Sequence, residues 1–410
     1  MAKNYASIYS SELDSSSLNQ TLYIKKELSN GTMIAPEGSD FVFVLAGGSQ
    51  NFTQPLESSA HRSGRHNNNT IKKKKALEWS YPTYINVDTG AAAGEDELES
   101  GLSVLWESVL GRKLVDGSGV HYDSAVDPSI TMTIHEIGDM WSKQAYGCFV
   151  DACEITFAGD GESQLAWSGM GVESFLCGLS KSVADNNGGN EVTVATGEGK
   201  RFPKGAMVML VGTDGTTRSS DTPTGAPRTV VGVTGDVVTL DGAALADADG
   251  TAADVYLVYY EPESPVGIDN PQTGLVGGFA SSTMGMQCIR SGTVSIANNH
   301  EAVNYCFGED ALSGSLFIPA SRLEVTCSVE INMSKKNVGI YNDVQSFIPQ
   351  DIQFILGDDT TRHFAVTLPR VEMSIPAISV PDSGSIPVTF EGTAYQTSLD
   401  AADEVKVEYL

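Results

Sequence analysis

Apolar and polar residues alternate along much of the chain, which is the pattern of strands that bury one face. The clearest runs are ACEITF, EVTCSVEI, PVTFEG and EVKVEYL, at 152–157, 324–331, 387–392 and 404–410. A period near 3.6 residues appears instead at 95–110, where leucines, Trp106 and Val109 predict an amphipathic helix that ends at Gly111. A shorter helical turn is expected at 338–347. The pattern therefore predicts a mainly β protein with few helices.

One segment in the middle of the chain differs from the rest in composition and pattern. Between 186 and 262 five short strand-like runs are separated by turns rich in Gly, Pro and Asp: EVTVA, AMVMLV, RTVVGV, DVVTL and DVYLVYY. Five short strands of this kind predict a small closed barrel, which leaves no open sheet edge. The flanking NNGGN and EPESP are typical of linkers. The sequence thus predicts a first domain at 1–185, an inserted barrel at 186–262 and a second domain at 263–410.

The two parts outside this insert resemble each other. LEWSYPTYINV at 77–87 aligns without a gap with LEVTCSVEINM at 323–333. Further along, CEITF and LAWSGMG within 153–171 match VEMSI and VTFEGTA within 371–394, with five more residues in the second intervening loop. Two matches in the same order predict a duplicated domain.

Charge and motifs narrow the possible functions. The 410 residues carry 25 Lys+Arg against 52 Asp+Glu, a formal net charge of −27, which argues against a surface that grips nucleic acid. No apolar run approaches the roughly 20 residues that a membrane helix needs. The motifs GxSxG, GxxxxGK[ST], GxGxxG and HExxH are all missing, and His135-Glu136 lacks a second His. We therefore expect no enzymatic activity, no cofactor and no metal site. The six cysteines show no CxxC spacing and are expected to be mostly buried.

The segment 61–75 is the one basic island of the chain. It holds six cations and no acid: Arg62, Arg65, Lys72, Lys73, Lys74 and Lys75. A solvated loop and a contact for self-assembly on an otherwise acidic body explain it equally well. Binding of nucleic acid is a weaker interpretation, because no aromatic residue is interleaved for base stacking.

These features together resemble the tail tube proteins of long, non-contractile-tailed bacteriophages, the siphovirus major tail proteins. The residues that carry the resemblance are SRLEVTCSVEINMSKKNVGIYNDV at 321–344, the stretch from VTLPRVEMSI to GTAYQTS at 366–398, the closing DEVKVEYL and the opening YIKKELSNGTMIAPEGSDFVFVL at 23–45. The resemblance covers both flanks of the insert, about four-fifths of the chain. The insert is a departure, because related tubes often place an extra domain at the C-terminus.

The resemblance implies a structural virion protein rather than an enzyme. It implies two tail-tube β-sandwich or barrel domains, each with an α-helix, beside the inserted barrel. Such chains self-assemble into stacked rings that form the hollow tube through which phage DNA is ejected without specific binding. With two domain copies per chain, three chains would close a ring of pseudo-sixfold symmetry, and six chains per ring is the alternative. The implied location is the virion tail, assembled in the cytoplasm of the bacterial host.

The resemblance also implies particular partners and leaves two other functions open. The partners are further copies of the chain, a tape measure protein, a tail terminator and a distal tail protein. One alternative is another tail component of the same fold, such as a distal tail or tail-completion protein. The other is a surface or glycan-binding module that uses the barrel.

The strand alternation also indicates which residues would line the lumen of such a tube. It places Glu78, Glu154, Glu324, Glu330 and Glu372 on polar faces, opposite apolar residues such as Ile155 and Ile375. Glu78 aligns with Glu324 and Glu154 with Glu372 in the repeat. We expect the five carboxylates to face the lumen; faces turned to bulk solvent are the alternative. The basic island is expected to form a hairpin tip that meets the next ring.

Overall fold

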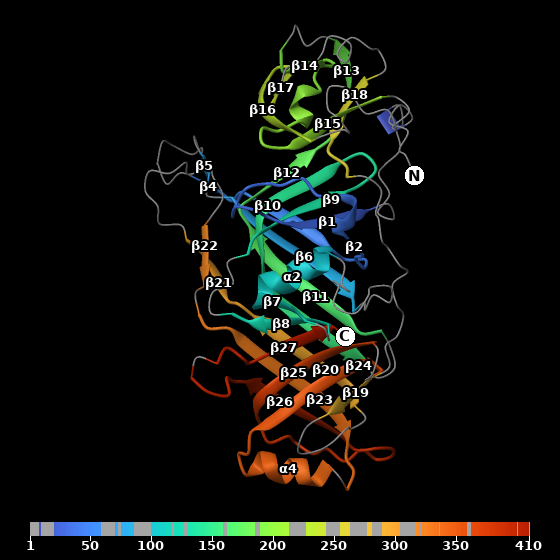
Figure 1. Cartoon of the computed structure of the whole chain (residues 1–410), viewed down its shortest axis with the longest axis vertical. Helices are drawn as coiled ribbons and strands as arrows, with labels where there is room; N and C mark the ends of the chain where they lie inside the picture. The colour runs from blue at the N-terminus through green and yellow to red at the C-terminus, as the bar shows by residue number, and fades with distance from the viewer. Residues whose placement is uncertain are drawn as a thin grey trace. The chain divides into compact units, whose positions relative to one another are not determined.

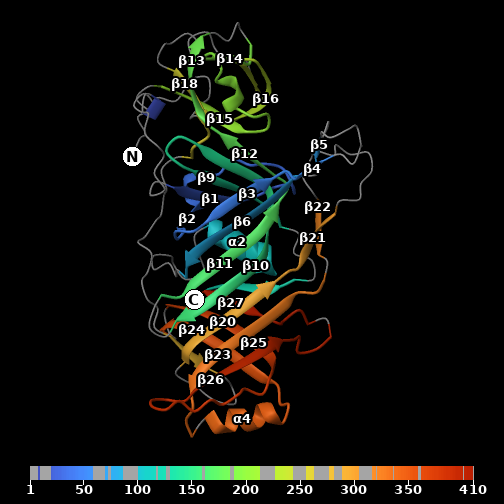
Figure 2. The same cartoon turned by 180° about the vertical axis from the view of Figure 1, so that it is seen from behind.

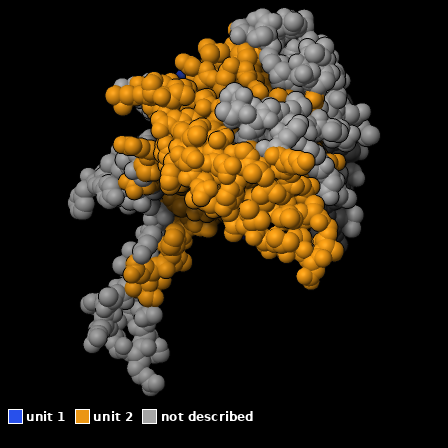
Figure 3. All heavy atoms as spheres, turned by 90° about the horizontal axis from the view of Figure 1, so that it is seen from below, with its two compact units in different colours: residues 1–42, 132–148, 172–267 blue, residues 43–131, 149–171, 268–410 orange. Residues whose placement is uncertain are grey.

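The structure, a computed structural model, is mainly β, as the sequence predicts (Figure 1). It describes residues 8–9, 20–58, 70–72, 75–85, 100–116, 119–125, 130–158, 162–184, 189–212, 227–242, 255–262, 277–280, 289–303, 316–319, 321–335, 337–358, 362–399 and 401–409. The chain forms two compact units, of which Figure 3 shows unit 2 in orange. Unit 1 comprises 1–42, 132–148 and 172–267, and unit 2 comprises 43–131, 149–171 and 268–410.

Unit 1 contains an antiparallel sheet and a closed barrel. The strands of the sheet, in spatial order, are β2 (Phe41–Val42), β1 (Thr21–Lys26), β9 (Met132–Ile137), the first half of β10 (Ser142–Ala158) and β12 (Glu173–Cys177). The barrel closes in the order β13 (Leu179–Ala184), β14 (Glu191–Val194), β17 (Val237–Leu240), β16 (Arg228–Thr234), β15 (Met207–Gly212) and β18 (Val255–Tyr259), which pairs back with β13. Short 3₁₀ turns at Gly38–Asp40 and Gly199–Arg201 complete the described elements of this unit.

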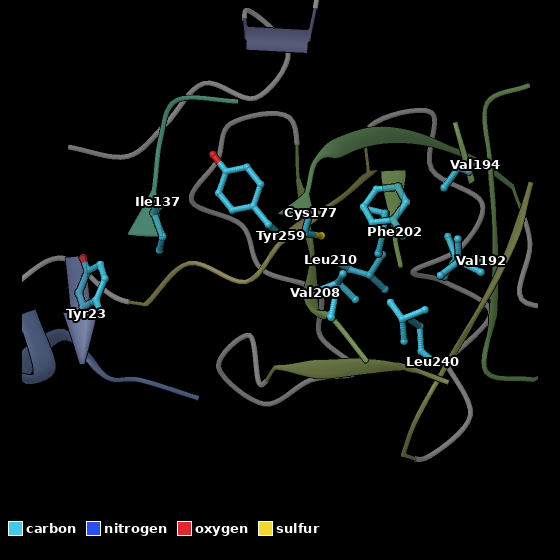
Figure 4. Packing of buried hydrophobic residues seen from close by; sticks show 14 residues of the cluster. Tyr23, Ile137, Cys177, Val192, Val194, Phe202, Val208, Leu210, Leu240 and Tyr259 are labelled. Carbon is cyan, nitrogen blue, oxygen red and sulfur yellow. The ribbon is translucent and has the colours of Figure 1, made fainter. Parts of the chain in front are cut away.

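Alternate residues of the barrel strands point inward and fill it (Figure 4). Phe202, Val208, Leu210 and Tyr259 are fully or almost fully buried in this core. The five expected strands are present as β14 to β18, but β13 joins them from before residue 186. The expected linker NNGGN, at 186–190, therefore stands in the sequence between two strands of the barrel, β13 and β14. The division of the chain at 186 and 262, and the view of the barrel as an insertion, remain predictions.

The barrel is fastened to the sheet of unit 1 by buried polar contacts. The side chain of Gln144 on β10 accepts a hydrogen bond from the Met207 amide at 2.7 Å and donates one to the Met207 carbonyl at 2.8 Å. The Tyr259 hydroxyl donates to the Gly138 carbonyl at 3.0 Å, and the Tyr260 hydroxyl donates to the Pro36 carbonyl at 3.0 Å. Gln144 is fully buried, and its side-chain amide bonds to both the N–H and the C=O of Met207, as the backbone of a neighbouring strand would.

The Gln144→Ala substitution should lower the free energy of unfolding by about 2–3 kcal/mol, since it leaves the buried Met207 amide without this acceptor. Gln164→Ala, on an exposed position of unit 2, is the matched control and should change stability by less than about 0.5 kcal/mol. Urea unfolding of both variants tests the difference. Equal stabilities would show that this amide does not hold the barrel to the sheet.

Unit 2 consists of two antiparallel sheets that share one strand (Figure 2). The first sheet runs in the order β3 (Ser49–Thr53), β6 (Ala76–Tyr84), β11 (Gln164–Gly171), the second half of β10, β20 (Ile289–Ala297), β23 (Glu324–Asn332), β26 (Pro387–Ala394) and β25 (Arg362–Met373). The second runs β19 (Gly277–Ala280), β24 (Gln350–Asp358), β25, β27 (Lys406–Tyr409), β8 (Gly119–Ser124) and β7 (Gly111–Asp116). Separate hairpins join β4 (Leu56–Ser58) to β5 (Thr70–Lys72) and β21 (His300–Val303) to β22 (Leu316–Pro319).

Two helices, α2 (Ser100–Leu110) and α4 (Asn337–Gln345), are present among the described residues of unit 2. Both lie where the sequence predicts them, although residues 95–99 fall outside the described part. Helix α2 ends at Gly111, whose φ of +89° suits glycine. Helix α4 begins at Asn337, a few residues after the end of β23 at Asn332.

The core of unit 2 is aromatic and contains residues from both sheets. Trp106 of α2 meets Trp167 of the first sheet edge-to-face at 4.7 Å, and its Nε1 donates a hydrogen bond to the Tyr409 hydroxyl of the second sheet at 2.9 Å. Phe157 of β10 stacks on Phe354 of β24 at 4.5 Å. All five side chains are essentially inaccessible to solvent. Helix α2 therefore joins the two sheets through its tryptophan.

The cysteines are buried where they are described. Cys148, Cys153, Cys177 and Cys327 are free thiols in the interior. Burial raises the pKa of the Cys327 thiol to about 12, so this thiol stays neutral at physiological pH. Their expected role as small apolar core residues is confirmed for these four, while Cys288 and Cys306 lie outside the described residues.

Candidate functional site

The first sheet of unit 2 has one continuous polar face. We define the polar face by these half-buried or exposed residues: Asn51, Glu78, Ser80, Tyr84, Ala152, Glu154, Thr156, Gln164, Ala166, Ser168, Met170, Ser291, Thr293, Ser295, Ala297, Glu324, Thr326, Ser328, Glu330, Glu372, Thr389, Glu391 and Thr393. Its opposite face is the buried one, with Leu77, Trp79 and Val325 among its residues. Period-two alternation of the strands produces this separation.

The strand register places all five candidate carboxylates on this one face. Directly paired residues of antiparallel strands point to the same side, and so do residues two apart along a strand. Glu78 pairs with Met170, and Ala166 on the same strand pairs with Glu154. From Glu154 the direct pairs continue across the sheet through Ser295, Thr326, Thr393 and Glu372. Glu324 and Glu330 are spaced by even numbers from Thr326 and share its side.

Two of these carboxylates are paired with arginines. Arg290 lies 2.8 Å from Glu330, and Arg370 lies 2.8 Å from Glu372. Such exposed pairs contribute only about 0–1 kcal/mol each. Among the described residues no Lys or Arg lies within ion-pair distance of Glu78, Glu154 or Glu324. The two ion pairs therefore leave part of the negative charge of the polar face uncompensated within the described part of the chain.

The expected alternation holds on β6, β10 and β23 but not at the end of β25. Ile155 is buried opposite the exposed Glu154, as predicted. Ile375, expected opposite Glu372, is instead half exposed. The reason is that β25 ends at Met373, so the period of a strand no longer fixes the direction of Ile375.

Sequence analysis missed the strand that joins the two halves of the polar face. β20 lies between β10 and β23 and presents Ser291, Thr293 and Ser295 on the polar side. The signal was available, because SGTVSIA alternates small polar with apolar residues. Glu391 on β26, opposite Ser328, was also missed and adds a sixth carboxylate to the face.

The aligned strands of the repeat make the same pairings. β6 pairs with β11 and β11 with β10, while β23 pairs with β26 and β26 with β25. The registers differ: Trp167 lies opposite Tyr81, whereas the aligned Phe390 lies opposite Val329, two residues beyond the position that aligns with Tyr81. An even shift keeps every side chain on its face.

The basic island is described only in part. Lys72 lies in β5, directly opposite Leu56 of β4, so it belongs to a hairpin. The Lys75 ammonium lies 5.3 Å from the centre of the Phe52 ring, a cation–π contact. Arg62, Arg65, Lys73 and Lys74 lie outside the described residues. The proposed role of these six cations in ring stacking remains a prediction.

Two depressions open on unit 2, and residues of the polar face line part of each. The smaller, of about 300 Å³, is lined by residues that include Glu78, Ser168 and Asp151. The larger, of about 1040 Å³, lies at the ends of β23 and β26. In the larger one the polar groups bond to one another: Arg370 to Glu372 at 2.8 Å and Gln396 to Glu404 at 2.9 Å. These polar groups are therefore occupied by one another, which is typical of a surface that stabilises the fold.

The polar face is acidic and consists mostly of short side chains. Many of its side chains are Ser or Thr hydroxyls and Glu carboxylates, and the carboxylates repel polyanions. Tyr84 ends one row, where its hydrogen bond to the Glu162 carboxylate raises the pKa of its phenol. Within the described ranges no three His, Cys, Asp or Glu side chains form a group that would suit a metal ion. Nor do the described helices include one long and apolar enough to cross a membrane.

No protein-family model matches the chain, and no curated protein matches it either.

Proposed function

We propose that the chain is a structural subunit that self-assembles into stacked rings, the hollow tail tube through which phage DNA is ejected. The observation that supports this most is the continuous polar face, which collects the five candidate carboxylates on one side of one sheet. A conduit for DNA must avoid binding its cargo, and phosphates that pass a wall of carboxylates are repelled. The short Ser and Thr side chains between the carboxylates suit the same role.

Duplication of a tube domain supports a ring of three chains. The two strand triples, β6–β11–β10 and β23–β26–β25, make the same pairings, and each belongs to one half of the repeat. Head-to-tail contacts close into a ring only at the right rotation, and two domain copies in each of three chains would give pseudo-sixfold symmetry. The barrel of β13 to β18 would then be an addition outside the tube wall.

Assembly of the purified chain tests the proposal. We expect hollow tubes by negative-stain electron microscopy and a fast-sedimenting species by ultracentrifugation. A chain that stays monomeric over a wide range of concentration and salt would contradict the proposal. Closed rings that do not stack would favour a distal tail or tail-completion protein instead.

Cysteine labelling tests which surface lines the channel. Ala166 is exposed on the polar face and pairs with Glu154, and Thr234 is exposed at the end of β16 in the barrel. Ala166→Cys should react with a bulky polymer-linked maleimide before assembly and be protected afterwards, while Thr234→Cys, the control, should react in both states. Equal labelling of Ala166→Cys before and after assembly would contradict a lumen position for the polar face.

A further inference from the structure

One end of unit 2 exposes a group of large apolar side chains. We define the α4 end surface by Val338, Phe347, Ile348, Ile375, Ile378 and Val380. The first three belong to α4 and the turn after it, and the others to the connection between β25 and β26. The two segments lie side by side at their ends, where the Met333 amide donates to the Ile386 carbonyl at 2.8 Å and Gln350 pairs with Val371. Figure 3 views unit 2 from the end that carries α4.

Phe347 stands in a backbone conformation that normally belongs to glycine. Helix α4 closes with a Schellman motif: the Phe347 amide donates to the Val344 carbonyl at 3.0 Å, and the Ile348 amide donates to the Asp343 carbonyl at 3.0 Å. Phe347 takes the left-handed position of this motif with φ of +55°. A bulky residue is strained there, and Phe347 is 84% exposed, so the isolated chain gains little from it. A contact with another chain would account for a phenylalanine at this position.

The α4 end surface is also free of net charge. Residues 333–350 and 374–386 carry Lys335 and Lys336 against Asp343 and Asp382, so their charges sum to zero on a chain of −27. Two copies of so acidic a chain repel each other over most of their surfaces. They can approach most easily through a neutral, apolar region. Exposed apolar clusters of this kind mark protein interfaces.

We propose that the α4 end surface is the docking site for a second copy of this chain. The contact is heterologous, so that it leaves the same surface free at the other end of the pair and allows continued addition. Phe347 and Val380, which are 84% and 72% exposed, are the anchors that become buried. The proposal rests on the proposed self-assembly and specifies the surface that carries it.

Phe347→Gly separates this interface from the stability of the chain. Glycine suits the left-handed position, so the variant should melt at the same or a higher temperature than the wild type. It should also raise the concentration needed for assembly by about tenfold or more, because it removes an interface anchor. Val380→Ser should weaken assembly in the same direction without lowering the melting temperature. Leu28→Ser, at a position 93% exposed in unit 1, is the matched control and should assemble like the wild type.

Sedimentation and electron microscopy of the four proteins separate the outcomes. Tubes that form at the same concentration with Phe347→Gly and Val380→Ser would overturn this surface and leave the proposed function standing. Closed oligomers of the wild type that both variants abolish would support the surface and contradict the tube. Equal weakening by Leu28→Ser would overturn the assignment of the α4 end, because any exposed apolar residue would then act alike. A wild type that never associates would overturn both proposals.

Discussion

Trp106→Ala should lower the free energy of unfolding of unit 2 by about 4–5 kcal/mol, near the upper end for a buried tryptophan. Trp106 is completely buried and touches both sheets, through Trp167 on one side and Tyr409 on the other. Its removal leaves a cavity between elements that are far apart in sequence. The Tyr409 hydroxyl also loses the indole donor. The measurement is guanidinium unfolding followed by tryptophan fluorescence and far-ultraviolet circular dichroism.

Two milder variants separate packing from hydrogen bonding at this site. Tyr409→Phe keeps the ring but leaves the buried Trp106 Nε1 without its acceptor, which should cost about 1–3 kcal/mol. Trp106→Phe keeps part of the aromatic contact and should fall between Tyr409→Phe and Trp106→Ala. If Trp106→Ala cost no more than Tyr409→Phe, packing of α2 between the sheets would not be the main source of stability in unit 2.

His135 should make unit 1 sensitive to acid. Its ring is fully buried, and neither ring nitrogen has a hydrogen-bond partner among the described residues. It sits on β9 between Tyr23 of β1 and Gln144 of β10, with the ring of Tyr260 edge-on at 6.3 Å. These neighbours are neutral, so nothing among them stabilises an imidazolium. Burial consequently lowers the pKa of His135 to about 3.

The sign of the pH effect follows from proton binding. In the unfolded chain the imidazole has a pKa of about 6.5, so below that pH the unfolded state binds a proton that the folded state refuses. The contribution of neutral His135 to the free energy of unfolding is therefore complete above pH 6.5. It is lost as the pH falls towards about 3. The loss approaches about 5 kcal/mol, from the 1.36 kcal/mol for each unit of pKa difference.

A comparison of two variants tests the acid effect. His135→Leu removes the titrating ring, so its stability relative to the wild type should increase progressively between pH 6.5 and pH 4, as measured by urea unfolding. His121→Leu is the control, because the His121 imidazole lies 3.1 Å from the Glu408 carboxylate, whereas the neighbours of His135 are neutral. A constant difference between His135→Leu and the wild type across this pH range would contradict the account.

The parts of the fold that sequence predicts best are those with strict alternation. On β6 and β23 the buried and exposed positions follow directly from the pattern, since a strand with one covered face permits no other register. The barrel strands β14 to β18 were predicted from a different signal, namely short strand-like runs separated by turns rich in Gly, Pro and Asp. β13 was missed because NNGGN, which follows it, has the composition of a linker. Composition cannot distinguish a linker from a turn between two strands of one barrel.

The parts that sequence could not predict depend on long-range contacts. β10 is 17 residues long and pairs with β9 and β12 in its first half and with β11 and β20 in its second, and no local pattern reveals four partners. The end of α4 carries no glycine at its left-handed position, so the usual signal for its C-terminus is missing. That the five carboxylates share one face emerges only from the pairing of seven strands. Their direction in an assembly depends on contacts with other chains.

Cryo-electron microscopy of assembled tubes tests the central claim most directly. A helical reconstruction should show three chains per ring, with the polar face of the first sheet turned towards the channel. At least three of the carboxylates of Glu78, Glu154, Glu324, Glu330 and Glu372 should point into it. A reconstruction in which fewer than half of the five reach the channel, with the polar face turned to the outer solvent, would contradict the account.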